Sequence, residues 1–142
     1  MNISKISLGL VGLAMCLGAS SAMAEEMKYM ATLTGADEVP PVMTDGKGMV
    51  SAMYDTSTKK LTWTTESSGL TGDATAAHFH GPAKMGENAK PAVPVKLDML
   101  AKGSADLTEA QAKDLADGMW YFNIHTAKNP NGEIRGQVKP AM

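Results

Sequence analysis

Short segments of alternating apolar and polar residues recur along the chain, and turn-forming residues separate them. Such alternation gives a β-strand one apolar and one polar face, whereas an amphipathic helix needs a period of about 3.6 residues. Gly, Pro, Asn and Asp end each run after a few residues. The predicted strands are 28–34, 48–54, 61–65, 73–80, 92–97, 120–126 and 133–139. The sequence therefore predicts an all-β fold, an antiparallel Greek-key β-sandwich of about 7–8 strands.

One segment departs from this pattern and predicts a short surface helix near residues 108–117. Thr108 is the expected N-cap, and Gln111 completes a capping box three residues later. Gly118 marks the end of the helix. Because the remaining positions are mostly polar, we expect this helix to lie on the surface of the sandwich.

Composition and charge exclude several classes of protein. The chain has 142 residues, of which 44% are hydrophobic and 20% are charged, and its formal net charge is −2. These values are typical of one globular domain. The basic residues are scattered, and Lys59 and Lys60 are the only adjacent pair. We therefore expect no nucleic-acid partner.

The first 24 residues have the pattern of a signal peptide. A lone Lys5 precedes an apolar run over residues 6–17, and the small-residue motif Ala22-Met23-Ala24 follows. The apolar run is shorter than the roughly 20 residues that span a bilayer, so no membrane span is expected. Cleavage after Ala24 would leave residues 25–142 as one β-sandwich domain in the periplasm or outside the cell.

The single cysteine limits the chemistry of the exported chain. It is Cys16, which lies within the predicted signal peptide. The predicted mature chain therefore has no disulfide, no thiolate metal ligand and no catalytic thiol. Nitrogen, oxygen and thioether ligands remain.

The three histidines of the chain are the candidate metal ligands. His78 and His80 flank Phe79 within one predicted strand, so both imidazoles point to the same face. In the strand at 120–126, Phe122 and Ile124 take the core face and leave His125 on the opposite face. If the two strands are neighbours, the three imidazoles converge on the outer surface of the sandwich.

Four polar residues are candidates to support these ligands. Asn123 shares the outward face of its strand with His125. Matching the core faces of the last two strands places Glu133 or Arg135 opposite His125. Glu133 could then accept the second ring proton, whereas Arg135 would keep the ring neutral by charge repulsion. Glu38 lies in a stiff segment before two prolines and could pair with Arg135.

Imidazole ligands favour copper as the first choice of metal and zinc as the second. A site without Cys cannot be a blue-copper centre. Methionine thioethers could add a soft ligand for Cu(I), but we expect most of them to fill the core. The candidates are Met27, Met30, Met43, Met49, Met53, Met85 and Met119.

Three segments together resemble the chordin-type (CHRD) domain. They are Leu33–Pro41 (LTGADEVPP), Ala77–Ala83 (AHFHGPA) and Tyr121–Gln137 (YFNIHTAKNPNGEIRGQ), and the predicted helix precedes the last of them. The resemblance covers nearly all of residues 25–142. It implies an immunoglobulin-sized β-sandwich, often exported, which in bacteria commonly forms a whole small protein with no stated activity.

The histidine pattern has a second, weaker resemblance. An H-x-H pair on an outward sandwich face, joined by a His from a later strand, is similar to the copper site of copper/zinc superoxide dismutases. The chain lacks the fourth, bridging His and the Cys pair of that family. The resemblance therefore implies one copper ion and no zinc subsite.

Three functions follow as hypotheses. The first is an exported protein that holds one copper ion through His78, His80 and His125 for buffering, delivery or protection, with a protein partner for delivery. The second is a copper-dependent redox enzyme of the superoxide dismutase type. The third is a structural or protein-interaction module without metal. A sheet face that carries such a site could also form a homodimer.

Overall fold

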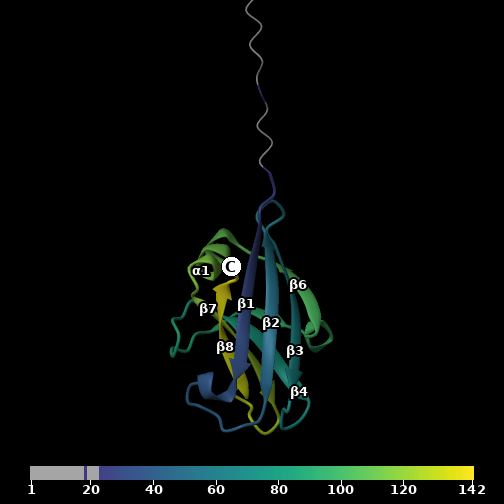
Figure 1. Cartoon of the computed structure of the whole chain (residues 1–142), viewed down its shortest axis with the longest axis vertical. Helices are drawn as coiled ribbons and strands as arrows, with labels where there is room; N and C mark the ends of the chain where they lie inside the picture. The colour runs from purple at the N-terminus through teal and green to yellow at the C-terminus, as the bar shows by residue number, and fades with distance from the viewer. Residues whose placement is uncertain (1–17, 19–22) are drawn as a thin grey trace, which may run out of the picture.

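The computed structural model describes residue 18 and residues 23–142. The predicted signal peptide falls largely on residues 1–17 and 19–22, which lie outside the described residues. Eight strands form the fold (Figure 1). Their bounds are β1 Glu26–Thr34, β2 Lys47–Asp55, β3 Lys60–Ser68, β4 Ala74–His80, β5 Pro91–Val95, β6 Lys102–Asp106, β7 Trp120–Thr126 and β8 Ile134–Pro140.

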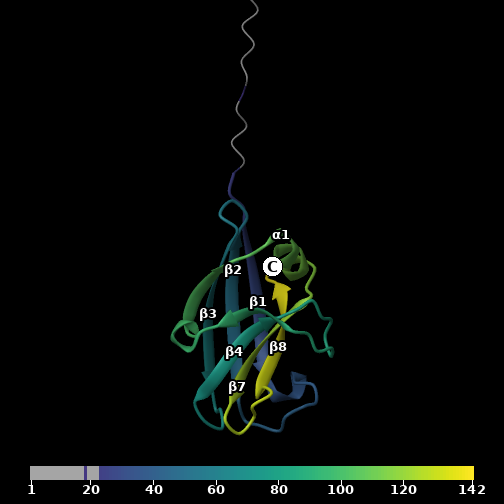
Figure 2. The same ribbon diagram turned by 180° about the vertical axis from the view of Figure 1, so that it is seen from behind.

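All neighbouring strands are antiparallel, and together they form one sheet that folds over on itself. The order across the sheet is β5-β4-β7-β8-β1-β2-β3-β6. Strands β1, β2, β3 and β6 make one layer, and β4, β7 and β8 cross it on the other side, which faces the viewer in Figure 2. The connections from β3 to β4 and from β5 to β6 pass from one half of the sheet to the other. The prediction of an all-β, sandwich-like fold is confirmed.

The core lies between the two layers and follows the predicted alternation. Phe122 and Ile124 of β7 have no exposed surface, as the sequence predicts. Across the layers, the Trp63 ring of β3 packs edge-on against Phe79 of β4, with ring centroids 5.4 Å apart. Phe79 in turn packs against Phe122 at 4.7 Å. Aromatic packing therefore ties the outer β3 strand to the histidine-bearing β4 strand.

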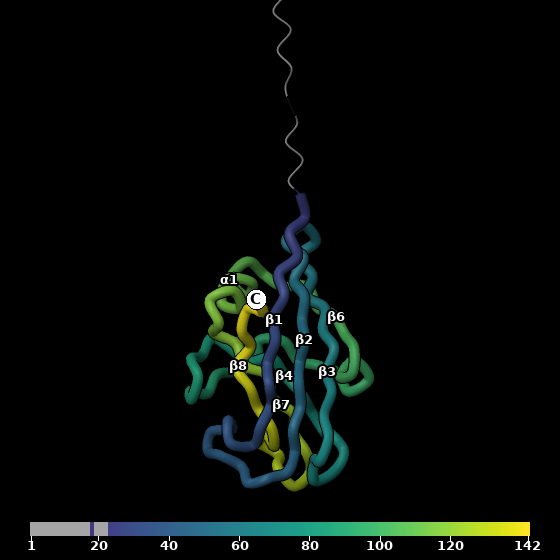
Figure 3. The backbone as a smooth tube through the Cα atoms, viewed as in Figure 1, coloured from purple at the N-terminus to yellow at the C-terminus, as the bar shows by residue number. Residues whose placement is uncertain are grey.

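The helix forms where the sequence predicts it. Helix α1 spans Glu109–Ala116, and Thr108 is its N-cap. The Thr108 hydroxyl accepts a hydrogen bond from the Gln111 amide at 3.2 Å, and the Gln111 side chain accepts one from the Thr108 amide at 2.9 Å. Gly118 follows with a positive φ of 72°. Leu115 is fully buried, so the helix covers the end of the sandwich near β8, where Figure 3 shows the C-terminus.

Two features differ from the expectations. Strand β6, with the sequence KGSAD, was not predicted because it has no apolar alternation. The methionines do not fill the core: none of the nine in residues 25–142 is buried, and Met43 is fully exposed. Aromatic residues, leucine, alanine and β-branched residues occupy the interior instead. Among the described residues, no helix is both long and apolar enough to cross a membrane.

Candidate metal centre

The pairing of β4 with β7 brings the three histidines together. In the register of these strands, Asn123 lies opposite His78, Tyr121 lies opposite His80, and His125 lies opposite Ala76. His125 is therefore the diagonal neighbour of His78 on the outward face. The condition that the sequence left open, namely that the two histidine-bearing strands are neighbours, is met.

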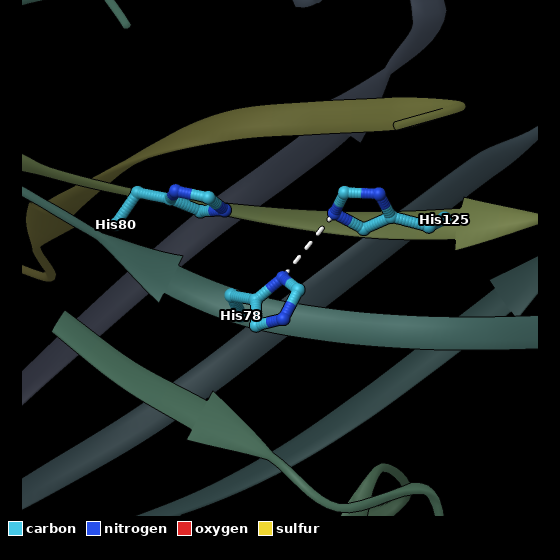
Figure 4. Close-up of side chains that lie close together, drawn as sticks. All are labelled: His78, His80 and His125. Carbon is cyan, nitrogen blue, oxygen red and sulfur yellow. Dashed lines mark hydrogen bonds between the residues drawn. The ribbon is translucent and has the colours of Figure 1, made fainter. Parts of the chain in front are cut away.

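The three imidazole rings converge on one point (Figure 4). One ring nitrogen from each of His78, His80 and His125 lies within 4.8 Å of the other two. Nδ1 of His78 is 3.2 Å from Nε2 of His125. His78 and His125 are half-buried, but only 8% of His80 is exposed. The expectation of a site wholly on the outer surface is thus wrong for His80, because the 81–90 loop covers it.

Two backbone carbonyls determine which nitrogen of each ring carries the proton. Nδ1 of His80 is 2.9 Å from the Ala89 carbonyl oxygen, and Nδ1 of His125 is 2.8 Å from that of Pro130. Because a carbonyl can only accept, each Nδ1 donates a proton. In the neutral rings, both Nε2 atoms therefore carry lone pairs.

Asn123 lies between these two Nε2 atoms. Its Oδ1 is 3.0 Å from Nε2 of His80 and 3.0 Å from Nε2 of His125. Its side chain is only 3% exposed. The sequence places Asn123 on the histidine face, and the structure brings it into direct contact with two of the three rings.

A stack of three planar groups holds His80 in place. The Tyr121 ring lies parallel to the His80 ring, with centroids 4.6 Å apart and an interplanar angle of 5°. The Arg135 guanidinium covers the other side of Tyr121 at 3.4 Å from the ring centroid. This contact is a cation–π interaction. The stack fixes the ring plane of His80.

Tyr121 and Arg135 also hold the loop that covers His80. The Tyr121 hydroxyl donates to the Ala89 carbonyl at 3.1 Å, and Arg135 donates to Asn88 Oδ1 at 2.7 Å and to the Glu87 carbonyl. The carbonyl that orients His80 is therefore itself anchored. Sequence reasoning missed Tyr121 as a supporting residue, although it lies on the histidine face of β7. It could not identify Ala89 and Pro130, because their backbone oxygens come from loops.

Burial and neighbouring rings favour the neutral form of two histidines. The pKa of His78 is lowered by burial and by the nearby His125 and His80. The pKa of His80 is also lowered by burial, although hydrogen bonds to Ala89 and Asn123 oppose this, and the Arg135 charge contributes a little. The sequence suggests this effect of Arg135 for His125, and the structure shows it for the pKa of His80.

Glu133 does not contact His125, contrary to one of the two expectations. Its carboxylate is fully buried and accepts hydrogen bonds from Thr44, Thr71, Thr126 and Asn129. Burial acts to raise the pKa of Glu133, but these hydrogen bonds outweigh burial and lower it to about 2. Glu133 therefore joins the loops at this end of the sandwich and is not a partner of the metal ligands.

Glu38 is a buried carboxylate close to the Asn123 side chain. Burial raises its pKa to about 7, against the charge of Arg135 and a hydrogen bond from Asn123. A Cβ added at Gly132 would collide with both Glu38 Oε1 and Asn123 Nδ2, so these two atoms flank the same glycine. Among the described residues, Glu38 has no ion pair within 4.0 Å, so the expected direct pair with Arg135 does not form.

A groove in the described part of the chain is remote from the histidines. It has a volume of about 620 Å³ and runs over β1, β2, β3 and β6. Met30, Met53 and Met99 contribute to its mostly apolar lining, with Lys28 and Lys102 beside them. None of the three histidines lines this groove, so the groove and the histidine cluster are separate features.

Fold and site together define a small all-β domain with a three-histidine cluster on two adjacent strands. The chain matches the family model described as the CHRD domain over residues 29–138. It therefore belongs to the CHRD domain family. Comparisons with curated proteins and with solved structures give no match.

Proposed function

We propose that this CHRD domain protein binds one copper ion through His78, His80 and His125 and acts in copper buffering, delivery or protection. The observation that carries the proposal is the convergence of three imidazoles, with one ring nitrogen of each within 4.8 Å of the other two. The carbonyls of Ala89 and Pro130 use the Nδ1 protons of two rings, so the Nε2 lone pairs point inward. A metal ion can accept converging lone pairs of this kind.

The surroundings of the cluster agree with a metal site. Metal-bound histidines usually donate their second ring proton to a carbonyl or carboxylate, and His80 and His125 both do so. The Tyr121 stack and the loop anchored by Arg135 hold His80 before any ion arrives. Preorganisation of this kind lowers the entropic cost of binding.

Copper is the first choice of ion and zinc is the second. Imidazole ligands suit both metals, and copper exceeds zinc in affinity for a given nitrogen site. The predicted signal peptide agrees with a role in the periplasm or outside the cell, where such a protein would bind copper and pass it to a protein partner.

The proposal is tested by titrating the protein with Cu(II), Cu(I) and Zn(II). We expect one tight site that disappears in the His78→Ala/His80→Ala/His125→Ala variant, which has no histidine left. A matched control replaces exposed thioethers instead, in the Met30→Leu/Met49→Leu/Met85→Leu variant. Equal binding by all three proteins would overturn the proposal and leave an interaction module without metal as the remaining hypothesis.

Superoxide dismutation is the second candidate function. Its support is that His78 and His125 are only half-buried, which leaves one side of the cluster open to a small substrate. We expect the copper-loaded protein to remove superoxide faster than the histidine-free variant measured with the same total copper. A rate equal to that of the variant would exclude this activity and leave the binding function in place.

A further inference from the structure

We infer that Asn123 is the fourth ligand of the proposed copper site, through its side-chain oxygen, and that it makes the site selective for the divalent ion. This inference rests on the proposed function. Its physical basis is the position of Oδ1, which lies 3.0 Å from Nε2 of both His80 and His125.

The distances between these donor atoms match those around a single ion. With metal–ligand bonds of about 2.0–2.1 Å, adjacent ligands are about 2.9 Å apart in a square arrangement and about 3.3 Å apart in a tetrahedron. The two contacts of Asn123 Oδ1 are 3.0 Å, and the contact between His78 Nδ1 and His125 Nε2 is 3.2 Å. Three of the six distances among these four donor atoms therefore already match a four-ligand shell, and the ring nitrogens all lie within 4.8 Å of one another.

The environment of the amide explains why its oxygen faces the histidines. Nδ2 of Asn123 lies on the side of Glu38, since both atoms flank Gly132. With Nδ2 on that side, the amide presents a possible donor to the Glu38 carboxylate, whereas an oxygen there would meet another acceptor. Glu38 is thus a positioning residue that directs Oδ1 toward His80 and His125.

The resulting set of three nitrogens and one oxygen favours a divalent ion. Tetragonal nitrogen and oxygen ligands suit Cu(II), whereas soft sulfur ligands select Cu(I). No sulfur atom belongs to this set. The unaltered protein should therefore bind Cu(II) more tightly than a three-histidine site alone would, with no matching gain for Cu(I).

The test compares Cu(II) and Cu(I) affinities of the unaltered protein with those of Asn123→Leu and Asn123→Asp. We expect Asn123→Leu to weaken Cu(II) binding by about tenfold or more and to leave Cu(I) affinity unchanged within about twofold. Asn123→Asp keeps an oxygen at the same place, so it should retain or increase the Cu(II) affinity. The Cu(II) electron paramagnetic resonance spectrum should change in both variants. The control is Asn131→Ala, at an exposed position in the nearby turn.

Several outcomes separate this inference from the proposed function. Cu(II) affinity and spectrum in Asn123→Leu equal to those of the unaltered protein would overturn the inference while the three-histidine site stands. An equal loss of Cu(I) and Cu(II) affinity would also overturn it, because Asn123 would then only shape the histidine cluster. Absence of Cu(II) binding by the unaltered protein would instead refute the proposed function. If circular dichroism shows that Asn123→Leu is unfolded, Asn123→Ser replaces it in the same comparison.

Discussion

Buried polar residues near the end of β7 have two distinct roles. Glu133 accepts hydrogen bonds from three threonine hydroxyls and so joins separate loops. Asn123 contacts two imidazoles instead, and its amide nitrogen lies on the side of Glu38. The sequence placed Glu133 and Asn123 in one group of supporting residues. Only their side-chain partners distinguish a carboxylate that joins loops from an amide that contacts two histidines.

The first prediction concerns Glu133 and acid stability. Its folded-state pKa of about 2 lies below the ordinary value of 4.5. Ionised Glu133 therefore stabilises the fold fully above pH 4.5, and this contribution is lost as the pH falls toward 2. The shift corresponds to about 3 kcal/mol. We expect Glu133→Gln to lower the free energy of urea unfolding by about that amount at pH 7, and by clearly less at pH 3.

The control for Glu133 is Glu66→Gln, which changes an exposed carboxylate on β3. Its effect should stay within about 0.5 kcal/mol at either pH. If Glu133→Gln and Glu66→Gln had the same small effect, the hydrogen bonds to Glu133 would not hold the loops together.

The strand face on which each histidine lies could be predicted from the sequence, but the burial of the histidines could not. Strand alternation alone places His78 and His80 opposite Phe79, and it places His125 opposite Ile124. The cover over His80 depends on a loop that Tyr121 and Arg135 anchor, and no periodic pattern marks that loop. Local sequence therefore predicts the direction of the histidine side chains, whereas the burial of His80 depends on tertiary contacts.

At the scale of elements, strong local signals gave correct predictions and weak ones did not. The strand at Trp120–Thr126 and the capped helix have clear patterns, and both form as expected. β6 has five small or polar residues and becomes a strand only because β3 offers an edge for pairing. Its Gly103 lies against the Trp63 ring, which leaves no space for a larger residue.

The second prediction concerns the helix cap. Thr108→Ala removes the hydroxyl that accepts from Gln111 and leaves one backbone donor without a partner. We expect a loss of about 1 kcal/mol in the free energy of unfolding, measured by urea denaturation. Thr108→Ser keeps the hydroxyl and should retain most of the stability. Equal losses in both variants would mean that the capping bond contributes nothing.

The third prediction concerns the close contact of β8 with β1. A Cβ at Gly136 would overlap with the Thr32 carbonyl oxygen. We expect Gly136→Ala to destabilise the protein by about 2 kcal/mol or more, because the two strands must move apart. Gly72→Ala, where a Cβ meets open space, should change stability by less than about 0.5 kcal/mol. A Gly136→Ala variant as stable as Gly72→Ala would contradict this packing.

At the scale of the whole molecule, the two halves of the sheet carry separate surface features. The histidine cluster lies on β4 and β7, whereas the apolar groove lies over β1, β2, β3 and β6. The sequence could predict the all-β class because the strands alternate. It could not predict that β8 pairs with β1 to join both halves into one sheet, since that pairing is long-range.

The fourth prediction links metal binding to the stability of the whole fold. An ion that binds only the folded protein stabilises it by about 2.7 kcal/mol when its free concentration is 100 times Kd. We expect Cu(II) to raise the thermal midpoint by several degrees in the unaltered protein and not in the histidine-free variant. Calorimetry at several Cu(II) concentrations measures this shift. An equal shift in both proteins would show binding elsewhere.

The most direct test of the central claim is anomalous X-ray diffraction at the copper edge from crystals of the copper-loaded protein. We predict one peak about 2.0–2.1 Å from a ring nitrogen of each of His78, His80 and His125. A peak remote from this cluster, or no peak above background, would contradict copper binding by the three histidines.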